Sequence, residues 1–421
     1  MFMRLFRHLY LLITLFIVIL TFPLFSQTNK TLADDPAKPS SFVRLVFIHH
    51  STGGNWLSDN WGGLAKTLFQ NNYYVSDVCY GWGRNSIGDR TDIGNWWEWF
   101  RDPEYSPAYL HDIYTVDQAD EQYGGYERNI CNPDPLGENK VIMFKSCFPN
   151  SALGGNPNDP VPSIDNNPMK REGAGSESYT IANAKGIYID LLEYFKKKQD
   201  KLFIVITAPP LSDTTYADNA RAFNLWLVND WLTGYPHSNV FVFDFYNCLT
   251  TNGGSIESND LGDESGNHHR WWNGAVQHTF DGSSNTLAYP SDNGNDDHPN
   301  PVGNEKTTSE YVPLLNVAYN RWIKSITKVD EMNSNLEFPV FKISPSPSKE
   351  NCMINYNLPG NSYLKIEVFN SIGIIIDKIT FNEVSQSGNY SYNNSLLNNG
   401  EYFLKFSTSW GIAVVPMIVV K

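Results

Sequence analysis

The sequence has no long apolar run beyond its first 25 residues, few basic residues and only five cysteines among 421. The missing apolar runs predict a mature chain without a membrane-spanning helix. The cysteine spacings match no zinc-binding pattern, so no metal site of that kind is expected. With 31 Lys and Arg against 45 Asp and Glu, the net charge is −14, and such a surface repels nucleic-acid phosphates. We therefore exclude nucleic acid as a partner.

The first 26 residues have the layout of a secretory signal peptide. A basic start precedes an apolar run from Leu9 to Phe25, and Ser26 is a small residue suited to cleavage before Gln27. A polar lead-in follows over residues 27–41. The alternative is a membrane anchor, because the apolar run approaches the lower length limit of a spanning helix. Export permits disulfides, but an odd number leaves at least one cysteine unpaired, and the pairing stays open. The cysteines are Cys79, Cys131, Cys147, Cys248 and Cys352.

Short, almost continuous apolar runs recur along the first three quarters of the chain, and such runs are typical of strands buried on both faces of a sheet. The expected strands are Arg44–His49, Tyr73–Cys79, Lys140–Lys145, Leu202–Thr207 and Val240–Phe245. Helical periodicity lies between several of them, as over residues 187–195. This alternation predicts an α/β domain with a parallel sheet over residues 42–328. Two long polar segments, Leu153–Tyr179 and Thr250–Asn295, are expected as functional loops or as surface decoration.

The pattern changes after Lys328. Residues 329–337 are expected to form a linker. From Phe338 onward the chain consists of short strand signals separated by turn pairs such as Pro359-Gly360 and Asn399-Gly400. Residues 338–421 are therefore predicted to form a small all-β, Ig-like sandwich.

Ser51 follows directly on the first expected strand. In doubly wound sheets, ligands bind beyond the carboxyl ends of the strands, so this is a position from which a side chain can reach a substrate. Gly53 and Gly54 permit a tight exit into a helix. A serine here is either a nucleophile, once a base removes its proton, or only the cap of the next helix.

A second polar segment stands just before the last expected helix. It contains Asp296, Asp297 and His298, followed by two prolines that stiffen the turn. A carboxylate close to a histidine can hold the ring in the tautomer that accepts a proton. His298 is therefore the candidate base for Ser51. The alternative is a surface turn whose aspartates cap the helix.

Two further segments offer donors for an oxyanion, the negative charge that develops when a carbonyl is attacked. One donor is the backbone N–H of Gly88, with Gly81 and Gly83 as alternatives. The other is the side-chain amide of Asn150. Because all these segments stand at strand ends or before the last helix, we expect them to meet at one edge of the sheet.

The order Ser51, Gly88, Asn150, His298 resembles the four blocks of SGNH/GDSL hydrolases, and the resemblance covers residues 49–326. It implies a three-layer α/β/α fold of flavodoxin-like type and a carboxylic ester hydrolase. In that family the first block carries the nucleophile, the second and third carry oxyanion donors, and the last carries the catalytic histidine with a nearby aspartate.

The resemblance has departures. The first block lacks the Gly-Asp-Ser-Leu form, and Ser151 stands where the third block commonly has an aspartate. The usual acid position, three residues before the histidine, holds Asn295. Asp296 is therefore expected to orient His298, with Asp297 as the second choice.

The C-terminal residues 338–421 resemble type IX secretion sorting domains. The resemblance rests on Ser344-Pro-Ser-Pro347, Ile354–Pro359, Gly400–Leu404 and the terminal Val419-Val-Lys421. It implies that the type IX machinery is a partner and that the protein is secreted or attached to the cell surface. The alternative is a plain Ig-like accessory domain.

These features predict an exported serine esterase that needs no cofactor and no metal, since His268-His269 and the acidic run Asp292–Asp297 lack a recognised ligand spacing. An acyl group such as acetyl on a carbohydrate is the expected substrate, because the long loops are polar and tryptophans cluster at residues 96–99 and 271–272. The alternative function is a catalytically inactive surface protein that binds carbohydrate on a hydrolase scaffold.

Overall fold

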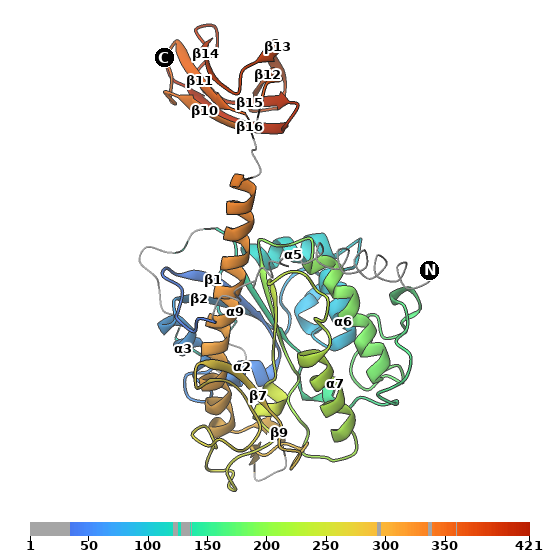
Figure 1. Cartoon of the computed structure of the whole chain (residues 1–421). Coiled ribbons are helices and arrows are strands. Elements are labelled where there is room, and N and C mark those ends of the chain that lie inside the picture. The colour runs from blue at the N-terminus through green and yellow to red at the C-terminus, as the bar shows by residue number, and fades with distance from the viewer. Residues whose placement is uncertain are drawn as a thin grey trace, which may run out of the picture. The chain divides into compact units, whose positions relative to one another are not determined.

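The computed structural model describes residues 34–120, 125–127, 135, 137–292, 296–335, 339–358 and 360–421 (Figure 1). The predicted signal peptide, most of the lead-in, Cys131 and Asn295 lie outside the described residues.

A five-stranded parallel sheet forms the centre of the α/β region. Its order is β2-β1-β3-β4-β5, the doubly wound order of flavodoxin-like sheets. The strands are β1 (Val43–Ile48), β2 (Tyr73–Val78), β3 (Val141–Lys145), β4 (Leu202–Ile206) and β5 (Val240–Phe243). Nearly every residue in them is buried, as continuous apolar runs predict. The five predicted strands are confirmed to within two residues at either end.

Helices cover both faces of the sheet, and alternate side chains of each strand enter two separate cores. On β1, Val46 and Ile48 belong to one core, whereas Leu45 and Phe47 belong to the other. The first core is closed by α4 (Trp96–Phe100), α5 (Ser106–Thr115), α6 (Ile181–Phe195) and α7 (Ala217–Asn229). The second is closed by α2 (Ser51–Leu57), α3 (Leu64–Gln70), α8 (Phe245–Cys248) and α9 (Pro301–Asn335). Figure 1 shows α6 and α7 on one side of the sheet and α3 and α9 on the other.

The long polar segment after residue 250 is partly ordered as short strands, which the sequence prediction missed. β6 (His268–Trp272) and β7 (Ala275–Thr279) form an antiparallel hairpin. Its turn is Asn273-Gly274, two residues with positive φ, as a tight hairpin requires. β8 (Pro290–Ser291) then pairs with β9 (Asp296–Pro299), which leads into α9.

The C-terminal region consists of two antiparallel sheets, as predicted. One has the order β10-β11-β14 and the other β13-β12-β15-β16. The strands are β10 (Val340–Ser344), β11 (Asn351–Asn357), β12 (Ser362–Asn370), β13 (Ile375–Val384), β14 (Ser387–Asn393), β15 (Gly400–Thr408) and β16 (Gly411–Val419). Their inward side chains share one core, which includes Ile354, Ile366 and Phe406.

The boundary before this region differs from the expectation. α9 extends to Asn335, so most of the segment expected as a linker is the last part of a helix. No glycine or proline stands between Pro313 and Asn335 to end the helix earlier.

Candidate active site

Ser51 is the first residue of α2, just beyond the carboxyl end of β1. The amides of Gly53 and Gly54 donate to the carbonyl of His50 and close the first turn. A Cβ on Gly53 would lie 2.4 Å from the Cβ of His49, so only glycine allows α2 to begin so close to the strand end. The sequence therefore presents the Ser51 hydroxyl on a sharp strand-to-helix turn.

Three side chains form a hydrogen-bonded row at this edge. The Nε2 atom of His298 lies 2.8 Å from Ser51 Oγ. The other ring nitrogen, Nδ1, lies 2.7 Å from Asp296 Oδ1. Ser51, His298 and Asp296 are thus brought together with the spacing that a serine nucleophile, its base and an orienting carboxylate require.

The ionisation of Asp296 fixes the tautomer of His298. Burial alone raises the pKa of the Asp296 carboxyl, but hydrogen bonds from the ring and the backbone N–H of His298 outweigh it and lower the pKa below its ordinary value. The carboxylate accepts a hydrogen bond from Nδ1–H, which leaves Nε2 as the acceptor that faces the Ser51 hydroxyl.

The sequence left Asp296 and Asp297 as alternatives, and the structure separates their contacts. Asp297 Oδ1 accepts a hydrogen bond from the backbone N–H of Ser212 at 2.8 Å. Asp296 contacts His298 and also accepts from Ser291 Oγ across the β8–β9 pair. Neighbouring residues of a strand point to opposite sides, which is why only one of the two reaches the ring.

Residues that follow β3 pack against the serine and the histidine. The Phe148 ring stands edge-on to the His298 ring at a centroid distance of 5.1 Å. Cys147 Sγ lies 3.6 Å from Ser51 Oγ and 3.4 Å from Thr52 Oγ1. These contacts restrict the orientation of the His298 ring and of the Ser51 hydroxyl.

Asn150 lies in the same short helical turn as Phe148, and its buried side chain is fixed by hydrogen bonds. Its Oδ1 accepts from the Ile93 backbone N–H at 2.9 Å and from the Tyr179 hydroxyl, and its Nδ2 donates to Asp92 Oδ1 at 2.5 Å. One of the two amide hydrogens is therefore used inside the protein. The second has no hydrogen-bond partner among the described residues.

The prediction that the amide of Gly88 faces an oxyanion is wrong. Its N–H donates to the Trp82 carbonyl at 2.9 Å, and its carbonyl accepts from His50 Nε2 at 2.7 Å. A Cβ at this position would lie 2.0 Å from the Cys79 carbonyl oxygen, so the glycine is required for close packing. Of the alternatives, Gly81 donates to Asp89 Oδ1 at 2.7 Å. The N–H of Gly83 has no hydrogen-bond partner in the described part of the chain.

The two histidines before Ser51 have structural contacts. His49 is buried and its Nε2 lies 2.9 Å from Asp77 Oδ2. The His50 ring stacks on Tyr80 at a centroid distance of 3.7 Å. Burial lowers the pKa of His50 to about 4, so this ring is neutral at neutral pH.

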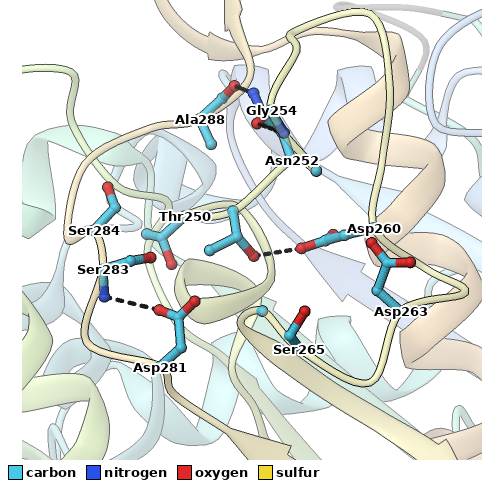
Figure 2. A pocket seen from close by; sticks show the side chains of 13 residues that line it. Thr250, Asn252, Gly254, Asp260, Asp263, Ser265, Asp281, Ser283, Ser284 and Ala288 are labelled. Atoms are coloured by element: carbon cyan, nitrogen blue, oxygen red, sulfur yellow. Dashed lines mark hydrogen bonds between the residues drawn. The ribbon is translucent and has the colours of Figure 1, made fainter.

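A polar hollow of about 400 Å³ lies among the loops that follow α8 and β7 (Figure 2). Ser51, Asp296 and His298 do not line it. The segment on its edge at Ala288 continues into β8, which pairs with the strand that carries His298. Its lining has hydroxyl, amide and carboxylate groups and no aromatic ring. The side chains that Figure 2 labels in it include Thr250, Asn252, Asp260, Asp263, Ser265, Asp281, Ser283 and Ser284.

Residues considered for metal or sugar binding have other contacts. His268 Nδ1 lies 2.7 Å from Glu310 Oε1, and His269 Nδ1 accepts from the backbone N–H of Asp244. In the part of the chain that the structure describes, no group of three or more His, Cys, Asp or Glu side chains is arranged to hold a metal ion. Trp96 and Trp99 are fully buried in the core and cannot present their faces to a sugar. Cys147, Cys248 and Cys352 are buried thiols that form no disulfide, and Cys79 is buried as well.

Comparison with known proteins identifies the C-terminal region. Residues 342–421 match the family of secretion system C-terminal sorting domains. The protein therefore carries a type IX sorting domain and is exported to the cell surface or beyond it. Among the described residues, none of the helices combines the length and the apolar character needed to span a membrane.

Similarity elsewhere is slight. Latent PorU from Porphyromonas gingivalis shares 16% identity over 20% of this chain and 9% of its own, with a TM-score of 0.17. An endo-β-1,4-mannanase from Thermotoga petrophila shares 10% identity over 88% of this chain and 62% of its own, with a TM-score of 0.19. A Cellulomonas fimi endo-β-1,4-mannanase double mutant gives 10% identity, coverages of 92% and 95%, and a TM-score of 0.21. No curated protein matches the chain.

Proposed function

We propose that this protein is an exported serine ester hydrolase of the SGNH/GDSL type. The observation that carries the proposal is the row of hydrogen bonds from Ser51 Oγ to His298 Nε2 and from His298 Nδ1 to Asp296 Oδ1. A serine that only capped α2 would accept hydrogen bonds from the next turn of the helix, whereas the N-cap is His50 and the contacts of Ser51 Oγ are with His298 and Cys147.

The proposed reaction has two halves. His298 Nε2 removes the proton from Ser51 Oγ as that oxygen attacks the ester carbonyl, and Asp296 stabilises the imidazolium that forms. The imidazolium then protonates the departing alcohol and leaves an acyl group on Ser51. Water attacks this acyl-enzyme with His298 again as base, and the acid departs. No metal or cofactor takes part in these steps.

Two donors are proposed for the oxyanion. Ser51 is the first residue of α2, and its backbone N–H has no hydrogen-bond partner among the described residues. The second donor is the amide hydrogen of Asn150 that Asp92 does not use. Asn150 is held by Ile93 and Tyr179, so its amide is fixed before the substrate arrives. Preorganised donors of this kind stabilise the transition state more than mobile ones do.

An acyl group such as acetyl on a carbohydrate is the proposed substrate. Export to the cell surface gives access to polysaccharides, and the hollow of Figure 2 offers many acceptors for sugar hydroxyls. Trp96 and Trp99 belong to the core and offer no surface to a sugar ring. The substrate class therefore rests on the polar loops.

Hydrolysis of p-nitrophenyl acetate by the purified protein tests the reaction class. Ser51→Ala is expected to abolish turnover above the solvent background. Ser58→Ala is the matched control, since Ser58 follows the same helix without a side-chain contact to His298, and it should retain turnover. A folded wild-type protein without Ser51-dependent turnover contradicts the proposal, and binding to glycans without turnover would favour the inactive scaffold. Acetate release from an acetylated polysaccharide then tests the substrate class.

A further inference from the structure

Lys145 is a buried cation beneath the nucleophile. It is the last residue of β3 and is completely shielded from solvent. Its Nζ donates to the hydroxyl of Thr52 and, at 3.1 Å, to the carbonyl of Ser146. The Phe245 ring lies 5.8 Å from Nζ on another side. The ammonium group thus contacts the residue next to Ser51 and is shielded from bulk solvent.

The other buried lysines differ from Lys145 in one respect. Lys201 pairs with Glu138, and Lys306 pairs with Asp260 at 2.5 Å. Lys145 has no carboxylate partner among the described residues. A buried charge without a counterion destabilises a fold, and a leucine or methionine would fill this space without that cost. The site therefore keeps a positive charge at a place where it lowers stability.

Hydrogen bonds lead from this charge to the nucleophile. Lys145 donates to Thr52 Oγ1, which leaves the Thr52 hydroxyl hydrogen for Cys147 Sγ at 3.4 Å. The Cys147 thiol in turn lies 3.6 Å from Ser51 Oγ. Ser51 itself donates to His298, so its oxygen is free to accept from the thiol. These contacts and the Ser51–His298–Asp296 row together connect the Lys145 ammonium to the Asp296 carboxylate.

We propose that Lys145 is a positioning residue whose positive charge, acting through Thr52 and Cys147, stabilises the partial negative charge on Ser51 Oγ as His298 removes its proton. This inference rests on the proposed serine hydrolase reaction. A fixed charge in a water-free site acts strongly on a neighbouring group, because little solvent screens it.

If the Lys145 charge acts on Ser51, the rate of reaction at Ser51 should depend on pH. Burial lowers the pKa of Lys145 to about 8, opposed only by the Cys147 thiol. Lys145 is therefore charged below pH 8 and neutral above it, so its contribution is lost as pH rises. The titratable groups that face it are Cys147 and His50, and His50 is already neutral across this range. The rate of reaction at Ser51 should fall above about pH 8.

The experiment measures the rate at which a fluorophosphonate probe labels Ser51 in the purified protein from pH 6 to pH 10. Lys145→Met should lower the rate at pH 7 on the order of 10- to 100-fold and remove the fall above pH 8. Lys145→Arg keeps the charge at all these pH values, so it should restore much of the rate and show no fall. Cys147→Ala removes the thiol that links Thr52 to Ser51, so it should lower the rate at pH 7 and weaken the fall above pH 8.

The outcomes separate the two proposals. A folded Lys145→Met protein with wild-type labelling, or with the alkaline fall retained, overturns the role of Lys145 alone. If that variant does not fold, a wild-type rate that stays level from pH 7 to pH 10 overturns it equally. If Ser51 in the folded wild-type protein is not labelled at any pH, the serine hydrolase proposal fails and the inference about Lys145 fails with it.

Discussion

His298 and Ser51 are 247 positions apart in the sequence, and His298 Nε2 lies 2.8 Å from Ser51 Oγ. The contact joins the exit of β1 to the strand β9, which enters α9 through Pro299 and Pro301. The Trp61 indole donates to the Pro299 carbonyl at 2.9 Å and ties this turn to the segment after α2. The serine and the histidine are thus held by separate elements that contact each other directly.

Asp296→Asn should lower kcat by about 10³- to 10⁴-fold, because an amide in place of the carboxylate favours the wrong tautomer of His298. Asp297→Asn is its matched control. Asp297 contacts the Ser212 backbone instead of the ring, so this variant should stay within a few-fold of the wild type. Steady-state hydrolysis of p-nitrophenyl acetate by both variants checks the pair, and equal losses would remove Asp296 from its assigned role.

Asn150→Ala should lower kcat by about 10²- to 10³-fold with little change in KM, as loss of one oxyanion donor does. Because Asn150 also holds Ile93, a second variant separates catalysis from structure. Tyr179→Phe removes one bond to Asn150 Oδ1 and leaves the amide in place, so it should cost only a few-fold. If Tyr179→Phe reduced kcat as strongly as Asn150→Ala, the residue would act as a scaffold and not as a donor.

The sequence identified the sheet because its strands are buried on both faces and read as continuous apolar runs. It also singled out Ser51 and His298, which lie in contact in the structure, because strand ends and the last turn before α9 are the places where a parallel sheet presents side chains. The sequence left Asp296 and Asp297 as alternatives, because the direction of each side chain depends on the pairing of β8 with β9, where no strand was expected.

The position of Gly88 in the sequence does not show whether its N–H is free to bind an oxyanion. Its position after β2 was correct, but whether its N–H is free depends on a turn in which Trp82 accepts that hydrogen. Lys145 was missed for a related reason. A lysine at the end of an apolar strand looks like an exposed terminus, and its burial depends on Thr52 and Phe245 from other elements.

Asp244→Asn should destabilise the α/β region by about 3 kcal/mol or more, because the carboxylate is fully buried and bonded to the Thr207 hydroxyl and to His278. Burial raises its pKa, yet the bond and charge of His278 outweigh this and lower it below the ordinary 3.8. A carboxyl whose pKa is lower in the folded state than in the unfolded chain stabilises the fold when the pH is above its ordinary pKa. This stabilisation is lost as the pH falls through the folded-state pKa. Urea unfolding should therefore show a large difference at pH 7 that shrinks toward pH 3. The exposed Asp165→Asn is the control and should change little at either pH.

A chain that ends at Asn335 should retain ester hydrolysis and lose delivery to the cell surface, because residues 342–421 form the sorting domain. The end of α9 sets the boundary. Trp322 is buried in the second core, so a chain that ends at Asn320 should lose both folding and turnover. Activity assays on intact cells and on purified protein distinguish delivery from catalysis, and surface activity of the Asn335 chain would contradict the assignment.

The most direct test of the central claim is mass spectrometry of the protein quenched in acid during turnover of p-nitrophenyl acetate. The account predicts an acetyl group on the peptide that contains Ser51, and it predicts that His298→Ala greatly reduces this acetylation. Turnover by the wild-type protein with the acetyl group on another residue, or with undiminished acetylation of Ser51 in His298→Ala, would contradict the account.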